Sequence, residues 1–323
     1  MHNPISEAIS GRMLHLILFP TEACNCRCVY CYETYRHGRM DTATISGVKN
    51  LLHARISELD YLHISWFGGE PLLALDIIEE LSEHIHQEIA DAPGCHFQAD
   101  VTTNAYLLSL PTFTRLSRCK VGLYQISFDG PQELHDQKRI LADGGGTFDR
   151  IWSNLLALKE TNDDVSFLIR LHLDRVNYPH LYAFLDQYNQ AFQDDHRFRL
   201  FIRPLSRLGG PHDAILPVFD EQEGQQATRE LARYAASHNI PNKTLHDFPT
   251  MCYAAKLNSF VVRANGDINK CTVSLDHECN KVGVVRKNGT LRLDKKRLFQ
   301  WVRGIESGNE RELLCPLENM AFS

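Results

Sequence analysis

The sequence predicts an α/β fold: a partial, TIM-like (βα)6 barrel followed by a small C-terminal domain of β-hairpins and a helix. Three observations lead to this fold class. Short apolar runs alternate with helical patterns through the first 240 residues, the 323 residues suffice for one large and one small domain, and the local pattern changes after about residue 245. We therefore expect a barrel over residues 1–240 and a second domain over residues 245–323.

Each predicted barrel strand is a short apolar run that ends in a turn signal. Amphipathic patterns between the runs predict helices, and parallel strands need such crossover connections. A closed barrel has eight units, so six units predict an open one. The predicted strands are His15–Thr21, Leu62–Gly68, His96–Thr103, Gly122–Phe128, Ser166–Leu173 and Arg197–Pro204, and the predicted helices are Asp41–Leu59, Pro71–Ala90, Pro111–Arg118, Phe148–Thr161, Tyr178–Ala191 and Asp220–Ser237.

The C-terminal region reads as hairpins. Short β-like runs at Ser259–Arg263, Val282–Arg286 and Thr290–Leu293 are separated by turns that contain Asn265-Gly266 and Asn288-Gly289. An Asn-Gly pair between alternating residues is a strong hairpin signal. In the barrel, by contrast, reactive residues are expected at the carboxyl ends of the strands.

Charge and hydropathy exclude several functions. The formal net charge of −6 disfavours nucleic-acid binding, which needs a basic surface. The longest apolar run near the N-terminus, Leu14–Phe19, is interrupted by His15 and is far shorter than a bilayer span or a signal sequence requires. We therefore expect a cytoplasmic protein with no membrane or nucleic-acid partner.

Ten cysteines form two groups that lie far apart in the chain, with Cys95 and Cys119 between them. In a chain without an export signal, clustered cysteines favour metal or iron–sulfur ligation over disulfides. The two isolated cysteines are expected to be buried, reduced thiols. The first group is Cys24, Cys26, Cys28 and Cys31, and the second is Cys252, Cys271, Cys279 and Cys315.

The first group follows the first predicted strand directly. Cys24, Cys28 and Cys31 have the spacing C-x3-C-x2-C, and three thiolates can hold three irons of a [4Fe–4S] cluster. The fourth iron then stays open to a substrate, much as a catalytic zinc keeps one position free. A structural zinc site that includes Cys26 is the alternative, but four cysteines within eight residues are crowded for zinc. We interpret Cys26 as packed rather than ligating.

This spacing, with Tyr30 before the last cysteine, resembles the radical S-adenosylmethionine (radical SAM) superfamily. The string Tyr30-Cys31-Tyr32-Glu33 resembles its peptide-modifying branch. The resemblance implies that Cys24, Cys28 and Cys31 are the catalytic cluster ligands and that the free iron binds the amino and carboxylate groups of SAM. One electron then cleaves SAM to methionine and a 5′-deoxyadenosyl radical, which takes a hydrogen atom from the substrate.

Further motifs follow the next strands. Phe67–Pro71 (FGGEP) resembles the family motif that contacts the SAM amino group, and Ser127–Gly130 (SFDG) resembles a segment near the SAM ribose or carboxylate and the substrate. Arg170 offers a guanidinium to the SAM carboxylate. Turn, capping or salt-bridge roles are the alternatives for all of these. The predicted cofactor-binding residues are Tyr30, Gly68, Gly69, Glu70, Pro71, Asn104, Ser127, Asp129 and Arg170.

The distal cysteines resemble a shortened SPASM domain of the twitch type. Cys252-x13-Gly266-x4-Cys271 fits the beginning of that pattern, but only Cys315 remains of its later cysteines. Four cysteines can saturate one cluster, so the resemblance implies one auxiliary [4Fe–4S] cluster. Whether Cys279 is its fourth ligand stays open, and a zinc ribbon is the alternative.

The resemblance implies a maturase of a ribosomally made peptide that forms crosslinks such as cyclophanes or thioethers, or epimerises residues. The strings His135–Arg139 and Gly146–Ile151 support this reading. The expected partners are a precursor peptide, a reductant such as flavodoxin or ferredoxin, and a separate leader-binding protein, because no leader-binding domain fits ahead of Cys24. A dehydrogenase or epimerase of a sugar or aminocyclitol is the alternative, and formylglycine formation in a sulfatase is a further one.

Overall fold

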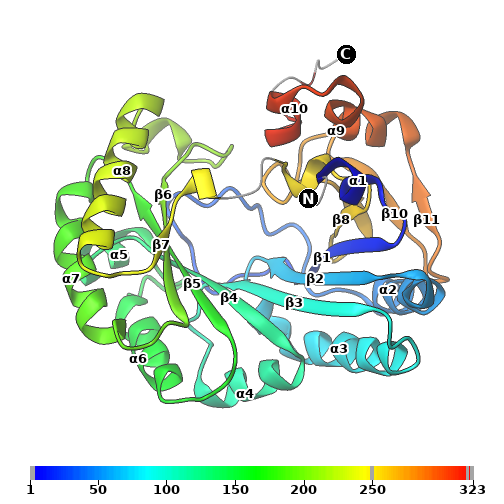
Figure 1. Ribbon diagram of the computed structural model, residues 1–323, viewed down its shortest axis with the longest axis horizontal. Coiled ribbons are helices and arrows are strands. Elements are labelled where there is room, and N and C mark those ends of the chain that lie inside the picture. The colour runs from blue at the N-terminus through cyan, green and yellow to red at the C-terminus, as the bar shows by residue number, and fades with distance from the viewer. Residues whose placement is uncertain (1–3, 248–250, 318–319, 321–323) are drawn as a thin grey trace. The chain divides into compact units, whose positions relative to one another are not determined.

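The computed structural model describes residues 4–247, 251–317 and 320. The chain divides into two compact units (Figure 1). The first unit consists of Met1–Ala23, Tyr35–Ala99 and Pro249–Ser323, and the second consists of Cys24–Thr34 and Asp100–Phe248. The strand β3 (His96–Thr103) runs from the first unit into the second. The domain boundary expected near residues 240–245 stays a prediction.

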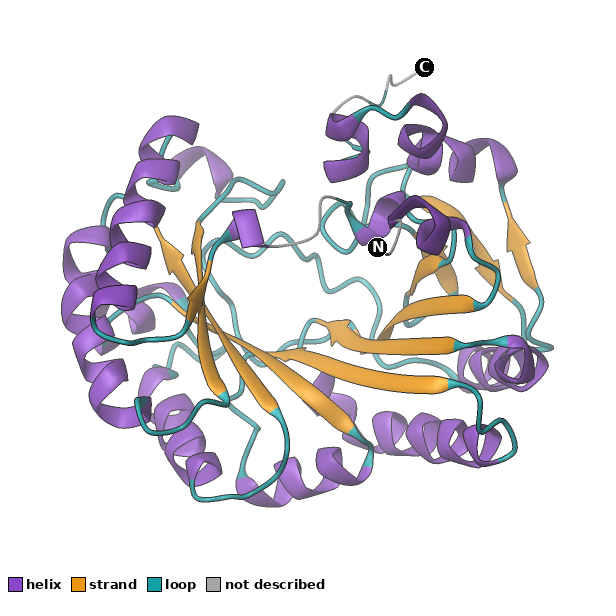
Figure 2. Ribbon diagram, in the orientation of Figure 1, coloured by secondary structure: helices purple, strands orange, loops and turns teal. Residues whose placement is uncertain are grey.

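The second unit is a parallel sheet with its strands in chain order after β3. Figure 2 shows the helices of this unit gathered along one side of its strands. Large buried side chains such as Tyr124, Phe167 and Phe198 fill the helix-facing side. The elements are β4 (Val121–Phe128), β5 (Ser166–Leu173), β6 (Phe198–Pro204), β7 (Asn242–Lys243), α4 (Leu110–Arg118), α5 (Gln132–Lys138), α6 (Phe148–Lys159), α7 (Leu181–Phe192) and α8 (Glu221–Ser237).

The first unit joins parallel and antiparallel strands in the order β11-β10-β9-β8-β1-β2-β3. The strand β8 lies parallel to β1, whereas β9, β10 and β11 continue from β8 as an antiparallel meander. The elements are β1 (Met13–Thr21), β2 (Tyr61–Gly68), β8 (Ser259–Val262), β9 (Asp267–Asn269), β10 (Lys281–Val285), β11 (Leu291–Leu293), α1 (Pro4–Ile9), α2 (Thr42–Arg55), α3 (Leu75–Ala90), α9 (Lys295–Ser307) and α10 (Glu310–Leu314).

The structure contains a strand at each of the six predicted barrel positions, so the parallel α/β class is confirmed. Two of these strands, β3 and β5, have the predicted bounds. The helix expected at Pro71–Ala90 begins instead as a 3-10 turn, Pro71–Ala74, in which Glu70 caps the backbone N–H of Leu72 at 3.0 Å and proline occupies the first position. The open barrel itself stays a prediction.

Turn chemistry explains the hairpins of the first unit. Gly266 and Gly289 have φ angles of 81° and 84°, in the left-handed region that glycine adopts without strain. Both glycines lie in the Asn-Gly turns that the sequence predicts.

None of the helices in the described part of the chain combines the length and apolar character that a membrane span requires.

Candidate functional site

The first cysteine loop belongs to the second unit and follows β1 in the chain. Its backbone is tied to the segment after α5: Arg27 N–H donates to Ile140 O at 2.7 Å and Val29 N–H donates to Lys138 O at 2.9 Å. Cys24, Cys28 and Cys31 are partly exposed, whereas Cys26 is buried. The three cysteines of the motif are therefore the accessible ones, and the fourth is packed, as expected.

The protonation of these thiols is uneven. The hydrogen bond with Cys26 and the nearby guanidinium of Arg139 lower the pKa of Cys28 to about 7. Cys26 is hydrogen-bonded to both Cys24 and Cys28, which raises its own pKa. Since the thiolate is the metal-binding form, Cys28 is prepared to ligate at neutral pH while Cys26 keeps its proton.

The donor set of this loop fits a cluster. Within residues 4–247, 251–317 and 320, no three histidine, cysteine or carboxylate side chains converge to hold a single metal ion. An iron–sulfur cube is held by thiolates on different irons, so its ligands need not converge on one ion. Asn104 lies beside the loop, because its amide nitrogen is 2.8 Å from Asn25 Oδ1 and 3.9 Å from Cys24 Sγ.

The glycine motif of the first unit packs against the end of β1. A side chain at Gly68, where φ is 123°, would overlap the Thr21 carbonyl oxygen, and one at Gly69 would overlap that of Ala23. Glu70 is fully buried, and its backbone N–H donates to Ala23 O at 2.9 Å. Pro71 opens the following 3-10 turn. Only glycine allows this close approach, and Ala23 directly precedes Cys24.

A buried polar cluster lies at the carboxyl ends of β4 and β5. Tyr30 donates its hydroxyl proton to Asp129 at 2.7 Å, and Arg139 donates to the Tyr30 oxygen at 2.6 Å. His172 Nδ1 is 3.4 Å from Asp129 Oδ1. Burial lowers the pKa of His172 to about 4, so the ring is neutral at pH 7. Burial alone would raise the pKa of Asp129, but its contacts with His172 and Arg139 hold it below the ordinary value.

Ser127 and Arg170 are paired in register on β4 and β5, and Arg203 is paired with His172 on the next strand. Paired residues of parallel strands share a face, as do residues two apart. Burial and the charge of Arg203 lower the pKa of Arg170 to about 10. Among the residues that the structure describes, Arg170 Nε has no hydrogen-bond partner, and no carboxylate pairs with either arginine. This face suits an anionic ligand.

The distal cysteines lie in the first unit. Cys271 interacts electrostatically with Cys252, Cys279 and Cys315. Burial raises the pKa of Cys252 to about 11 and also raises that of Cys271. Cys271 Sγ accepts a hydrogen bond from Val273 N–H at 3.3 Å, and Cys279 Sγ is 2.9 Å from His277 Nδ1. Residues from Cys252 to Cys315, 63 positions apart in the sequence, thus lie within electrostatic range of one another through Cys271.

Sequence reasoning missed some residues of these sites. Arg139 and His172 surround Tyr30 and Asp129, but no role was predicted for either. Their signal was weak: Arg139 ends the string that begins at His135, and His172 lies two residues after Arg170 on a predicted strand. His277, beside Cys279, was missed as well.

Comparisons agree with this architecture. The family model of the radical SAM superfamily matches residues 18–186, more than half of the chain. A protein of Methanocaldococcus jannaschii named only as uncharacterised is 27% identical over 287 residues, 88% of this chain and 92% of that protein. Native anSMEcpe with bound AdoMet and the Cp18Cys peptide has a TM-score of 0.66 at 20% identity, over 89% of this chain and 80% of that one. SuiB of Streptococcus suis bound to the precursor peptide SuiA has a TM-score of 0.62 at 18% identity, over 85% and 63%.

Proposed function

The chain belongs to the radical SAM superfamily, and we propose that it cleaves SAM reductively and modifies a ribosomally synthesised peptide. The observation that carries the proposal is the loop with Cys24, Cys28 and Cys31, in which these three thiols are partly exposed whereas Cys26 is buried. These three residues would hold a [4Fe–4S] cluster. When bound, the cluster supplies the electron that splits SAM into methionine and a 5′-deoxyadenosyl radical.

The remaining site residues would bind and orient SAM. The close backbone approach at Gly68 and Gly69, with Glu70 and Pro71, supports a contact with the amino group. Arg170, whose Nε has no hydrogen-bond partner among the described residues and which shares a face with Ser127, supports a contact with the carboxylate. Tyr30, Asn104 and Asp129 would complete the site. The hydrogen bonds among Tyr30, Asp129 and Arg139 hold the tyrosine ring in place.

The peptide substrate is supported by the two solved structures of similar fold, anSMEcpe with the Cp18Cys peptide and SuiB with the precursor peptide SuiA. The reaction would begin with hydrogen abstraction and end in a crosslink such as a cyclophane or thioether, or in epimerisation. In this proposal residues 1–240 form a partial (βα)6 barrel, and a flavodoxin or ferredoxin delivers the electron. A separate leader-binding protein would be a further partner.

The C-terminal region, residues 245–323, would hold one auxiliary [4Fe–4S] cluster on Cys252, Cys271, Cys279 and Cys315. The electrostatic influence of Cys271 on Cys252 and Cys279, and of Cys315 on Cys252 and Cys271, supports it. Such a cluster would accept the electron that remains on the substrate after hydrogen abstraction.

The first test is the iron and sulfide content after anaerobic reconstitution. We expect about eight irons per chain, the content of two [4Fe–4S] clusters. About four would contradict the auxiliary cluster and move a redox-neutral reaction, such as one on a small sugar, ahead of peptide oxidation.

The auxiliary site has its own test. In Cys271→Ala we expect about half of the iron, partly retained formation of 5′-deoxyadenosine, and a loss of peptide product measured by mass spectrometry. Cys95→Ala, which changes a buried cysteine outside both groups, is the matched control. A normal product yield from Cys271→Ala would remove the auxiliary cluster from the mechanism.

A further inference from the structure

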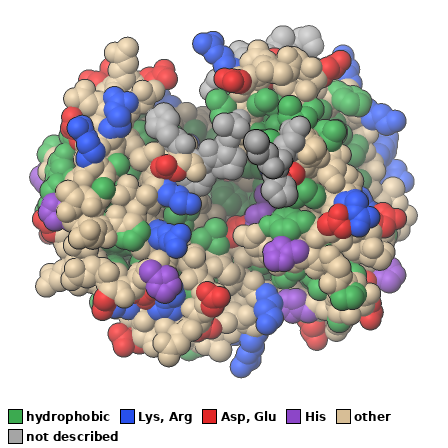
Figure 3. Space-filling view, in the orientation of Figure 1, with side chains coloured by type: hydrophobic (Ala, Val, Ile, Leu, Met, Phe, Trp, Pro, Cys, Tyr) green, Lys and Arg blue, Asp and Glu red, His purple; other side chains and the backbone are tan. Residues whose placement is uncertain are grey.

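One edge of the first unit is strongly basic. Residues 281–297 carry seven basic side chains and a single carboxylate, in a chain whose net charge is −6. All but Arg297 are exposed, and Figure 3 shows Lys and Arg side chains along the side of the molecule where β11 and the start of α9 lie. We call this set the basic edge: Lys281, Arg286, Lys287, Arg292, Lys295, Lys296 and Arg297.

Most of this charge is not neutralised by the protein. Lys281 Nζ is 2.7 Å from Asp267, and Arg297 Nε is 3.6 Å from Asp294. The other five have no carboxylate partner among the described residues. The basic edge therefore attracts an anionic partner, and does so more strongly at low salt.

The same edge offers a free strand. β11 is the last strand in the order and, within the described part of the chain, pairs only with β10, with Arg292 opposite Val284. On the β10 side, Arg286 N–H donates to Thr290 O and Asp294 N–H donates to Val282 O. Because backbone groups alternate in direction along a strand, those of Leu291 and Leu293 face the open edge. An extended chain could form hydrogen bonds there.

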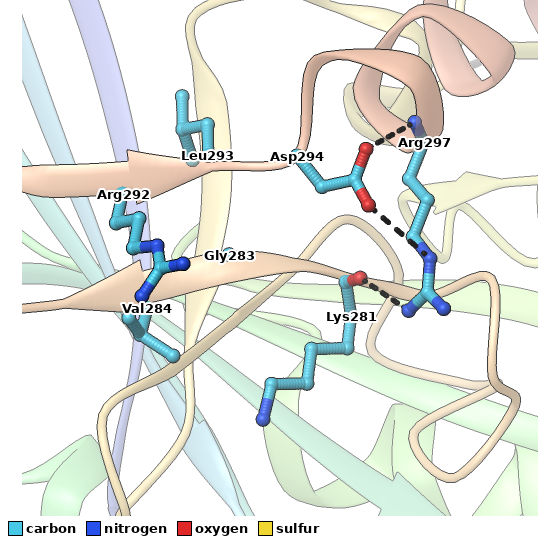
Figure 4. Close-up of a pocket in the computed structure, with 7 residues that line it drawn as sticks. All are labelled: Lys281, Gly283, Val284, Arg292, Leu293, Asp294 and Arg297. Carbon is cyan, nitrogen blue, oxygen red and sulfur yellow. Dashed lines mark hydrogen bonds and ion pairs between the residues drawn. The ribbon is translucent and has the colours of Figure 1, made fainter.

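A pocket lies beside this edge. It has a volume of about 500 Å³, in the range of small-ligand sites. Figure 4 shows Lys281 of β10, Arg292 of β11 and Arg297 of α9 around it, with the bare backbone of Gly283 between them. A side chain at Gly283 would overlap the carbonyl oxygen of Arg292. Gly283 therefore allows β11 to lie close against β10 on this side of the pocket.

We propose that the basic edge binds an acidic, extended segment of the peptide substrate as an added strand on β11. The proposal rests on the peptide-modifying function proposed above. Basic side chains often only protect an edge strand from unwanted pairing, but that role requires no pocket. A folded acidic electron carrier would use the charge but not the free backbone edge, whereas an extended acidic peptide uses the charge, the edge and the pocket together.

The test uses the reconstituted full chain without reductant, so that binding is read separately from SAM cleavage. The probe is a short, fluorescein-labelled synthetic peptide with alternating Glu and Thr, and fluorescence anisotropy measures its affinity. The double variant Arg292→Glu/Lys296→Glu should bind it about tenfold more weakly or worse. Arg229→Glu/Arg233→Glu, an equal charge change on the exposed face of α8, should bind as the wild type does.

Two changes to the probe separate added-strand binding from simple charge attraction. Two further probes carry N-methyl groups at either the odd-numbered or the even-numbered residues of the peptide. Only one of these two probes should bind more weakly, because only every second N–H would face β11. Replacing each Glu by Lys should abolish binding. An equal loss of affinity with both N-methylated probes would overturn the added strand. Equal binding to both charge-reversal variants, or no binding by the wild type, would overturn the site. An absence of 5′-deoxyadenosine with reductant would instead contradict the proposed function alone.

Discussion

At the scale of single residues, Arg139 links the cysteine loop to the polar cluster behind it. Arg139 is buried, with 8% of the residue exposed. Its guanidinium donates a hydrogen bond to Tyr30 and lies close enough to Cys28 to lower the pKa of that thiol. A fixed cation here offsets the negative charge of thiolate ligands, because a guanidinium stays protonated at any working pH. The proposed cluster ligand Cys28 and the residues proposed to bind SAM, Tyr30 and Asp129, therefore share one electrostatic environment.

The assignment of ligands makes a direct prediction. Cys28→Ala should reduce 5′-deoxyadenosine formation to background, since a cluster site without one of its three thiolates loses the iron position it held. Cys26→Ala should keep substantial activity, because its buried thiol is interpreted as packed. Chromatographic measurement of 5′-deoxyadenosine with excess SAM and reductant compares the two. Retained SAM cleavage in Cys28→Ala would refute the ligand assignment.

Arg170 should matter for SAM affinity. Removing a charge-assisted, bidentate contact costs about 1.5–3 kcal/mol, so Arg170→Met should weaken SAM binding roughly tenfold to a hundredfold. Arg199→Met, at an exposed position near the amino end of β6, is the control and should bind SAM normally. Equilibrium dialysis of the reconstituted protein gives both affinities. A loss of SAM affinity in Arg203→Met but not in Arg170→Met would show that Arg203, and not Arg170, contacts the carboxylate.

The residue scale also shows what sequence alone can provide. The three cysteines were proposed as ligands from their local spacing, and Arg170 was proposed as a SAM contact from its residue type on a predicted strand. Arg139 and His172 were not, because their contact with Tyr30 joins segments 109 and 142 residues apart. No local pattern encodes contacts of that range.

At the scale of elements, the turn after β2 depends on glycine. Gly69→Ala would push a methyl group into the carbonyl oxygens of Glu22 and Ala23, and backbone atoms cannot move aside as a flexible side chain can. We expect a clear fall in iron content and about a tenfold or greater loss of SAM cleavage. Gly94→Ala, where a methyl group meets nothing within 4 Å, should match the wild type in both assays. Equal behaviour of the two variants would disprove the close-approach argument.

The same difference between local patterns and long-range contacts decided which helices and strands could be predicted. Apolar runs with turn signals located all six strands of the predicted barrel, because burial imposes a pattern on the sequence. The two-residue strand β7 and the short helix α5 are too brief to carry a period. The parallel pairing of β8 with β1 joins residues 244 apart, such as His15 and Ser259. The sequence of a strand does not specify which distant strand it pairs with.

At the scale of the whole molecule, buried neutral histidines connect stability to pH. His135 is fully buried and accepts a hydrogen bond from Asp129 N–H at 3.4 Å, and burial lowers its pKa to about 3. Burial likewise lowers that of His172 to about 4. In the unfolded chain both rings titrate near 6.5. Between about pH 6.5 and the folded pKa values of these histidines, the unfolded state binds more protons than the folded state, so acidification favours unfolding.

The folded protein should therefore lose stability as the pH falls below about 6.5, by up to about 1.4 kcal/mol per pH unit for each of the two histidines, until their folded pKa values are reached. Urea unfolding of the cluster-free protein at several pH values measures the slope. His135→Gln should reduce that slope by the contribution of one proton, because a glutamine cannot titrate, even if the variant is less stable at pH 7. His212→Gln, at an exposed position, should leave the slope unchanged. If His135→Gln kept the full slope, the acid sensitivity would have to arise from other groups.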